Sequence, residues 1–269
     1  MSVRHRNNVS VYGSGSTTVV FAHGFGCDQA VWRFISPAFE ERYRILAFDL
    51  VGSGGSDLAA YDRARYASLQ GYADDLLDIL DEFADGPVIH IGHSVSAMIG
   101  MLAGIKAPER FLAQVMLAPS PCYINEEGYV GGFTRGDIDE LLETMDANYL
   151  GWSSNVAPII MGAPNAPQLA AELTHNFCRN DPDIARHFAR VTFLSDQRGD
   201  LPRVKVPTLI VQCSDDLIAP REVGDYLHRH IPGSRLHVLP NIGHCPHMSA
   251  PEESARATLA FLDALEAGA

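Results

Sequence analysis

The pentapeptide at 92–96, GHSVS, is the segment of this chain whose residue types point most directly to a reaction. It lies between the apolar runs 88–91 and 97–102, so the pattern predicts a strand, a tight turn with one serine, and a helix. Such a turn strains the serine backbone, exposes its hydroxyl and aims the next backbone N–H at a reacting carbonyl. The usual pattern ends in glycine, and Ser96 is also small enough for close helix–strand packing. The sequence therefore predicts Ser94 as a nucleophile, with an ordinary turn as the alternative.

A serine nucleophile needs a general base and an acid that orients the base, and both follow later in the chain. Asp216 lies in the loop after the strand pattern at 208–213, and His244 follows a glycine in the loop after the next strand pattern. We predict that Asp216 holds one tautomer of the His244 imidazole, and that His244 removes the proton of Ser94. Asp215 is the rival for the acid, and we interpret it as a solvated loop charge.

A second loop has the composition of an oxyanion hole. The segment 19–26 reads as a strand that runs into a loop with two glycines. Its early position fits the third strand of a hydrolase sheet, where the following loop donates a backbone N–H to the developing alkoxide. We predict the backbone N–H groups of Phe25 and Val95 as the two donors. Taken alone, the segment would be read as a simple turn.

The chain has eleven histidines and five cysteines, so most of them must have other roles. His247 follows His244 closely, but no second ligand cluster accompanies this pair, and we expect no metal. We interpret His93 as a packing or pocket-wall residue rather than a second base. The odd number of cysteines favours reduced thiols over a disulfide framework. Cys27 and Cys245 flank the catalytic loops and are candidates for the pocket wall.

Composition is that of an ordinary soluble enzyme with one substantial core: 269 residues, of which 46% are hydrophobic and 20% charged. The formal charge of −13 argues against nucleic acid or an anionic membrane as a partner. No apolar stretch approaches the roughly 20 residues of a membrane span, and no signal peptide is recognisable. The glycine-rich run 52–56 lacks both the Lys-Ser/Thr ending of a phosphate-binding loop and the glycine spacing of a dinucleotide-binding loop. We therefore expect a cytoplasmic protein without a cofactor.

Strand and helix patterns alternate along the chain, which predicts an α/β fold with a mostly parallel sheet flanked by helices. The predicted strands are 17–22, 43–48, 88–91, 114–118, 208–213 and 235–239. The predicted helices that flank the sheet are 70–83, 94–103 and 251–266.

The alternation breaks between about residues 121 and 201, and this interval reads as all-helical. The helices predicted there are 137–150, about 155–161, 166–179, and 182–194, the last capped by Asp181. We expect a core of residues 1–121 and 201–269, and a helical lid of residues 122–200. Inserted after the sixth strand of a hydrolase sheet, the lid would cover the strand ends where Ser94 is exposed.

The lid composition predicts the class of substrate. It has no cluster of arginines or lysines that would bind a carboxylate or a phosphate, so we expect an apolar, uncharged ester or lactone of modest size. The candidate pocket residues from both parts of the chain are Phe25, His93, Phe133, Trp152, Val156, Phe193 and Cys245.

Further motifs extend this pattern over nearly the whole chain, the lid included. They are HGFGCDQ at 23–29, GSGGSD at 52–57, GHSVSAM at 92–98, PSPCY at 119–123, GGF at 131–133, Asn148-Tyr149 with Trp152, and GHCPHMS at 243–249. Together they resemble the family of the bacterial stress-response regulator RsbQ, and they are also similar to the plant strigolactone and karrikin receptors. The 95–98 segment looks closer to the plant receptors, and Cys27 with 216–220 looks closer to RsbQ.

The resemblance implies an α/β-hydrolase fold with a four-helix lid, an apolar pocket, and a Ser-His-Asp triad at Ser94, His244 and Asp216. It also implies signalling, with slow hydrolysis or retention of a small apolar ligand and with the lid surface meeting a partner protein. Two hypotheses follow: a serine esterase or lactonase, or a ligand sensor that activates a partner such as a phosphatase. A dehalogenase is disfavoured because it needs an aspartate in place of Ser94, and nothing in the sequence singles out a haloperoxidase.

Overall fold

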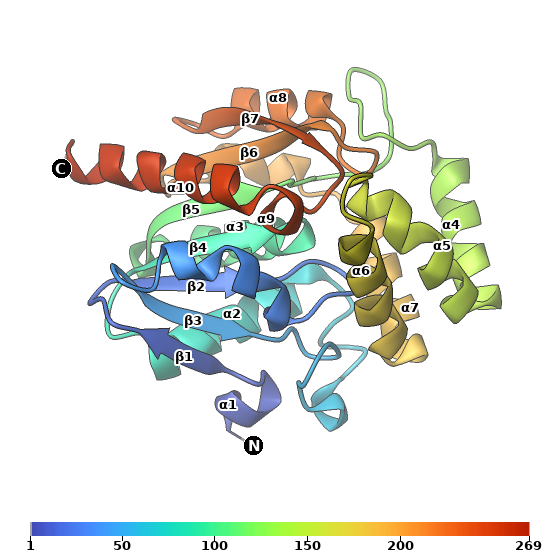
Figure 1. Ribbon diagram of the computed structural model, residues 1–269, viewed down its shortest axis with the longest axis horizontal. Helices are drawn as coiled ribbons and strands as arrows, with labels where there is room; N and C mark the ends of the chain where they lie inside the picture. The colour runs from blue at the N-terminus through green and yellow to red at the C-terminus, as the bar shows by residue number, and fades with distance from the viewer. Residues whose placement is uncertain (1, 269) are drawn as a thin grey trace.

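The apolar runs assigned to strands pair into a single sheet in the computed structural model, which describes residues 2–268. Within these residues seven strands are ordered β1-β3-β2-β4-β5-β6-β7 (Figure 1). Their bounds are β1 Ser10–Gly13, β2 Thr18–Ala22, β3 Arg44–Phe48, β4 Val88–His93, β5 Phe111–Leu117, β6 Thr208–Asp215 and β7 Arg235–Ile242. β1 pairs antiparallel with β3, and the other pairs are parallel. The predicted mostly parallel sheet is confirmed.

Helices cover both faces of the sheet, because successive strand residues point to opposite sides. Val20 and Leu46 pack in one apolar cluster with α2 (Leu69–Phe83), α3 (Val95–Lys106) and α8 (Arg221–His230). Their strand neighbours Phe21 and Ile45 belong to a second cluster that includes α10 (Pro251–Glu266). In Figure 1, α10 crosses in front of the sheet while α2 and α3 lie behind it. Two short helices, α1 (Val3–Arg6) and α9 (Pro246–Ser249), complete this part.

Four α-helices and a 3-10 helix, Arg198–Arg203, lie in the chain between β5 and β6, in the interval 118–207. The α-helices are α4 Arg135–Ala147, α5 Tyr149–Met161, α6 Pro167–Arg179 and α7 Pro182–Phe193. Figure 1 places them together beyond one end of the sheet. The predicted cap of α7 is confirmed, since the Asp181 carboxylate accepts the N–H groups of Asp183 and Ile184.

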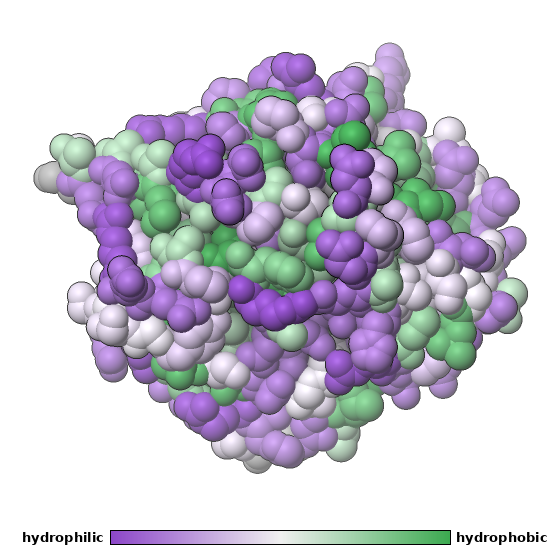
Figure 2. Space-filling model, viewed as in Figure 1, coloured by the Kyte–Doolittle hydropathy of each residue, from purple (hydrophilic) through white to green (hydrophobic). Residues whose placement is uncertain are grey.

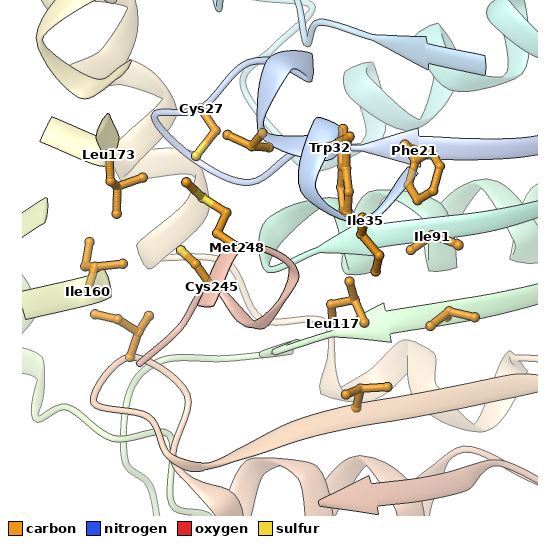
Figure 3. Packing of buried hydrophobic residues seen from close by; sticks show 14 of the residues in the cluster. Phe21, Cys27, Trp32, Ile35, Ile91, Leu117, Ile160, Leu173, Cys245 and Met248 are labelled. Carbon is orange, nitrogen blue, oxygen red and sulfur yellow. The ribbon is translucent and has the colours of Figure 1, made fainter. Parts of the chain in front are cut away.

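One apolar cluster runs from the sheet into these four helices. Figure 3 shows Phe21 and Trp32 against the sheet, with Ile160 of α5 and Leu173 of α6 at the opposite end of the same cluster. The Phe21 and Trp32 ring centroids are 4.8 Å apart. The four helices therefore share their core with the sheet.

Local details differ from the sequence prediction at several places, among them α5, which begins at Tyr149 and not at about residue 155. The expected helix 137–150 ends at Ala147, because the Asn148 side chain accepts the Gly151 N–H and starts a new helix. β1 and α8 were not predicted. The glycine loop follows the second strand of this sheet and the helical insertion follows the fifth, not the third and the sixth as expected.

The viewed surface of the protein is mainly hydrophilic (Figure 2). Figure 2 shows mainly hydrophilic residues on the viewed face, with apolar residues in separate smaller areas. Between residues 2 and 268, no helix combines the length and the hydrophobicity needed to cross a bilayer.

Candidate active site

Ser94 occupies the sharp turn between β4 and α3. Its φ of 54° and ψ of −121° lie in a region that residues other than glycine rarely adopt, as predicted for this turn. The turn is tight because α3 passes directly over the strand: a Cβ on Gly92 would lie 2.5 Å from the Ser96 carbonyl oxygen. Backbone geometry thus holds the Ser94 hydroxyl beyond the end of β4.

Ser96 makes a contact that the usual glycine lacks. Its side chain is fully buried, and its hydroxyl donates to the backbone carbonyl of His23 in the loop after β2. The two loops are neighbours because β2 and β4 pair, with Ala22 opposite Gly92. Ser96 therefore fixes the serine turn against the glycine loop.

The structure brings together Ser94, His244 and Asp216 from three separate loops. His244 Nε2 lies 2.7 Å from Ser94 Oγ, and His244 Nδ1 lies 2.7 Å from Asp216 Oδ2. A carboxylate beside Nδ1 favours the tautomer with the proton on Nδ1, which leaves Nε2 free to accept the serine proton. All three residues are buried. The arrangement can deprotonate a serine hydroxyl and stabilise the imidazolium that forms.

The Asp216 carboxylate is held by its own loop. Its Oδ1 accepts the backbone N–H groups of Ile218 at 2.8 Å and Ala219 at 3.1 Å, which leaves Oδ2 for the imidazole. Asp215, the rival candidate, is exposed, and its carboxylate accepts the Ser214 hydroxyl at 2.8 Å. Asp215 is therefore solvated as expected, but it is the last residue of β6 and not part of the loop.

The His244 backbone is held on two sides. Its N–H donates to the Ile160 carbonyl of α5 at 2.8 Å, and its carbonyl accepts from His93 Nε2 at 2.7 Å. Burial, together with the nearby His247 and His244 rings, holds the pKa of His93 well below its ordinary value. A neutral His93 with its proton on Nε2 therefore supports the loop that carries His244.

The predicted oxyanion donors come from two neighbouring segments, the start of α3 and the loop after β2. Val95 is the first residue of α3, a position whose N–H has no acceptor within its own helix. Phe25 stands between two glycines that leave no room for a side chain: a Cβ on Gly24 would lie 2.4 Å from the His93 ring, and Gly26 has a φ of +75°. The pairing of these two N–H groups around one oxyanion stays a prediction.

A small cavity of about 20 Å³ opens beside the Ser94 hydroxyl. Its wall is mostly apolar and comes from the sheet loops and from α5, α6 and α7. The lining residues are Phe25, Cys27, His93, Ser94, Tyr123, Ile160, Leu173, Phe177, Thr192, Phe193, Ile218, His244 and Cys245. The predicted pocket residues Phe25, His93, Phe193 and Cys245 are thus part of the wall.

Three predicted pocket residues lie outside this wall: Phe133, Trp152 and Val156. The Trp152 ring is stacked on Phe177, with centroids 5.9 Å apart and planes at 14°, and Phe177 itself faces the cavity. On α5 the wall position belongs to Ile160, one turn after Val156. Phe133 is tied by its backbone N–H to the Tyr123 carbonyl and packs, partly buried, against the core cluster.

Sequence reasoning missed several wall residues, among them Leu173, Phe177 and Thr192. Leu173 and Phe177 are four residues apart and so lie on one face of a helix. This spacing was the sequence signal that could have identified them as wall residues. Tyr123 was noted only as part of a motif. Burial raises the pKa of Tyr123 to about 12, so it stays protonated beside Ser94.

The cysteines of the cavity are not nucleophiles. Figure 3 shows Cys27, Met248 and Cys245 between the sheet and the two helix residues Ile160 and Leu173. Burial raises the pKa of both thiols, so they remain protonated and unreactive near neutral pH. Within residues 2–268, no three His, Cys, Asp or Glu side chains are grouped to hold a metal ion.

Comparison with known proteins agrees with this geometry. The family described as "Alpha/beta hydrolase family" matches residues 19–257. The karrikin insensitive 2 receptor CA of Petunia hybrida is 41% identical over 251 residues, 93% of each chain. The strigolactone esterase D14 of Arabidopsis thaliana is 39% identical over 250 residues, again 93% of each.

A solved structure is similar over nearly its whole length. The hydrolase olei00960 from Oleispira antarctica superposes with a TM-score of 0.94 and 43% identity, over 97% of this chain and 96% of that one. The comparisons confirm the predicted fold class and the resemblance to the plant receptors.

Proposed function

The chain belongs to the alpha/beta hydrolase family, and from this premise we propose that it is a serine hydrolase that cleaves a small apolar ester or lactone. The observation that carries the proposal is the continuous hydrogen-bonded series from Ser94 through His244 to Asp216, with both distances at 2.7 Å. A nucleophile, a base and an orienting acid in this order form a complete acyl-transfer machinery.

The reaction runs in two halves. Ser94 Oγ attacks the carbonyl carbon while its proton passes to His244 Nε2, and the Phe25 and Val95 N–H groups hold the oxyanion. The carbon–oxygen bond to the leaving alcohol breaks, and His244 returns the proton to that oxygen. His244 then takes a proton from water, whose oxygen attacks the acyl-enzyme. The acid is released, and Ser94 regains its proton.

The cavity supports an apolar, uncharged substrate. Its wall contains no lysine, arginine, aspartate or glutamate, so a charged substrate would lose its hydration without gaining a partner. We propose that helices α4 to α7, within the expected boundaries 122–200, act as a lid over Ser94, because α5, α6 and α7 contribute to the cavity wall.

Replacing the nucleophile is the direct test. We expect Ser94→Ala to lower kcat for 4-nitrophenyl acetate by about 10,000-fold or more, since neither the oxyanion hole nor binding replaces the nucleophile. Ser153→Ala, at another fully buried serine, is the matched control and should retain activity. Retention of turnover by Ser94→Ala would refute the assignment.

A second candidate function is ligand sensing with slow chemistry, favoured by the identity of about 40% to a protein named as a karrikin receptor. Intact-protein mass spectrometry during turnover of aryl esters and butenolide lactones separates the two. Rapid multiple turnover supports an ordinary hydrolase. A single slow turnover or a persistent adduct supports a sensor that acts through a partner protein, which ligand-dependent gel filtration with a candidate phosphatase would then test.

A further inference from the structure

Thr192 is a polar residue on the apolar face of α7. It follows Phe188 by four residues and Ala189 by three, and these spacings place all three side chains on one side of the helix. Thr192 is 1% exposed and lines the cavity beside Ser94. The residue therefore places a buried hydroxyl on a helix face that is otherwise hydrocarbon, next to the cavity.

The Thr192 hydroxyl lacks the contact that other helical threonines of this protein make. Thr144, Thr174 and Thr258 each donate to the carbonyl four residues earlier, all at 2.8 Å. Thr192 Oγ1 has no hydrogen-bond partner among residues 2–268, although it is buried. A buried hydroxyl without a partner is costly, and here the usual local solution is not taken.

Two histidines in the same cavity wall as Thr192 already have other hydrogen-bond partners. His93 Nε2 donates to the His244 carbonyl, and the His244 ring joins Ser94 to Asp216. The wall also carries the Tyr123 hydroxyl and the thiols of Cys27 and Cys245, and none of these groups is a hydrogen-bond partner of Thr192 Oγ1. A polar atom of a bound substrate is therefore a partner that the cavity can supply.

We propose that Thr192 Oγ1 is a specificity-determining group that donates a hydrogen bond to a second, neutral acceptor of the substrate, such as a ketone, ether or ring oxygen. This inference rests on the proposed function and narrows its substrate class to esters or lactones with one further uncharged oxygen. A charged acceptor is excluded because no cationic side chain lines the wall.

The test compares substrates that differ only in that oxygen. The probes are 4-nitrophenyl hexanoate and its 4-oxo and 5-oxo analogues, and the measured quantity is the ratio of kcat/KM between each oxo ester and the parent. We expect the wild type to prefer at least one oxo ester by about three- to tenfold, the range of one neutral hydrogen bond. Thr192→Val keeps the shape of the side chain and should bring the ratio between each oxo ester and the parent to about one. Thr192→Ser keeps the hydroxyl and should retain it.

Two outcomes would overturn the proposal: a wild type that does not discriminate between the esters, or a Thr192→Val variant that loses equal activity on all three. The second would mean that the hydroxyl has only a structural role.

Binding distinguishes this proposal from the proposed function. Calorimetric titration of the Ser94→Ala protein with the same three esters requires no turnover. If the wild type hydrolyses none of them, the proposed function fails, and tighter binding of an oxo ester that is lost in Ser94→Ala/Thr192→Val still supports the role of Thr192. Equal binding of all three contradicts it.

Discussion

The loops at the end of the sheet and the helices α4 to α7 solve different problems. In the loops, the atoms of the Ser94–His244–Asp216 series are paired with one another: Asp216 uses both carboxylate oxygens, and Ser96 ties two loops together. In the helices, buried polar atoms such as Trp152 Nε1 and Thr192 Oγ1 have no partner within residues 2–268. The loops hold the hydrogen-bonded atoms of Ser94, His244 and Asp216 at fixed distances. The helices instead enclose an apolar cavity.

From this difference we expect the loops to determine the rate of the reaction and the helices to determine which substrate binds. Changes in the loops should lower kcat strongly, because a misplaced base raises the free energy of the transition state. Changes in the helices should alter which substrate fits while the chemistry continues. At the candidate base His244, the two regions are joined by a backbone hydrogen bond: the Ile160 carbonyl of α5 accepts the His244 N–H.

The largest effect is expected on the loop side. Asp216→Asn should lower kcat by about 10,000-fold, because an amide favours the wrong imidazole tautomer. Steady-state kinetics with 4-nitrophenyl acetate measures it. Asp215→Asn changes the adjacent, exposed carboxylate and should leave kcat within about twofold of the wild type. Comparable losses in both variants would mean that the acid has been misassigned.

An intermediate effect is expected on the helix side. Leu173→Ala should destabilise the fold by about 2–5 kcal/mol and lengthen the cavity. We expect its kcat/KM for 4-nitrophenyl hexanoate relative to acetate to rise by about tenfold. Leu80→Ala removes an equally buried leucine from the opposite face of the sheet. It should lose similar stability in urea unfolding without any change of chain-length preference, and a shift in that control would contradict the division of roles.

The smallest effect concerns the free energy of unfolding at acidic pH, which should depend on buried histidines in the sheet and the segment after it. Burial lowers the pKa of His90 and of His247 to about 3, whereas an unfolded histidine titrates near 6.5. Between pH 7 and 5 the unfolded chain therefore binds protons that the folded chain refuses, and stability falls as the pH falls. Each such histidine should contribute about 1–2 kcal/mol to this loss.

Urea unfolding at pH 7 and pH 5 tests this expectation. His90→Gln should reduce the difference in free energy of unfolding between the two pH values by the contribution of one histidine. His175→Gln, at an exposed position in α6, is the control and should leave the difference unchanged. A His90→Gln variant with the full pH dependence would show that His90 is protonated in the folded protein.

The candidate catalytic residues were predictable because their signals are local. A strand, a small-residue turn and a helix around Ser94 require only neighbours in the chain, and Asp216 and His244 each follow a strand at its carboxyl end. Parallel strands end at the same edge of a sheet, so residues 150 positions apart in sequence meet there.

The cavity wall was less predictable because helical periodicity shows which residues share a face and not what that face meets. Trp152 and Phe177 are both buried aromatic residues, yet only Phe177 lines the cavity, since the two rings stack with Phe177 on the cavity side. Likewise, a threonine at position 192 is unremarkable in the sequence. Only the packing of α7 against the cavity shows that its hydroxyl is buried without a partner. Chain order and local pattern determined the candidate catalytic residues. The choice of wall residues depended on how whole helices pack, because side chains on one face compete for the same space.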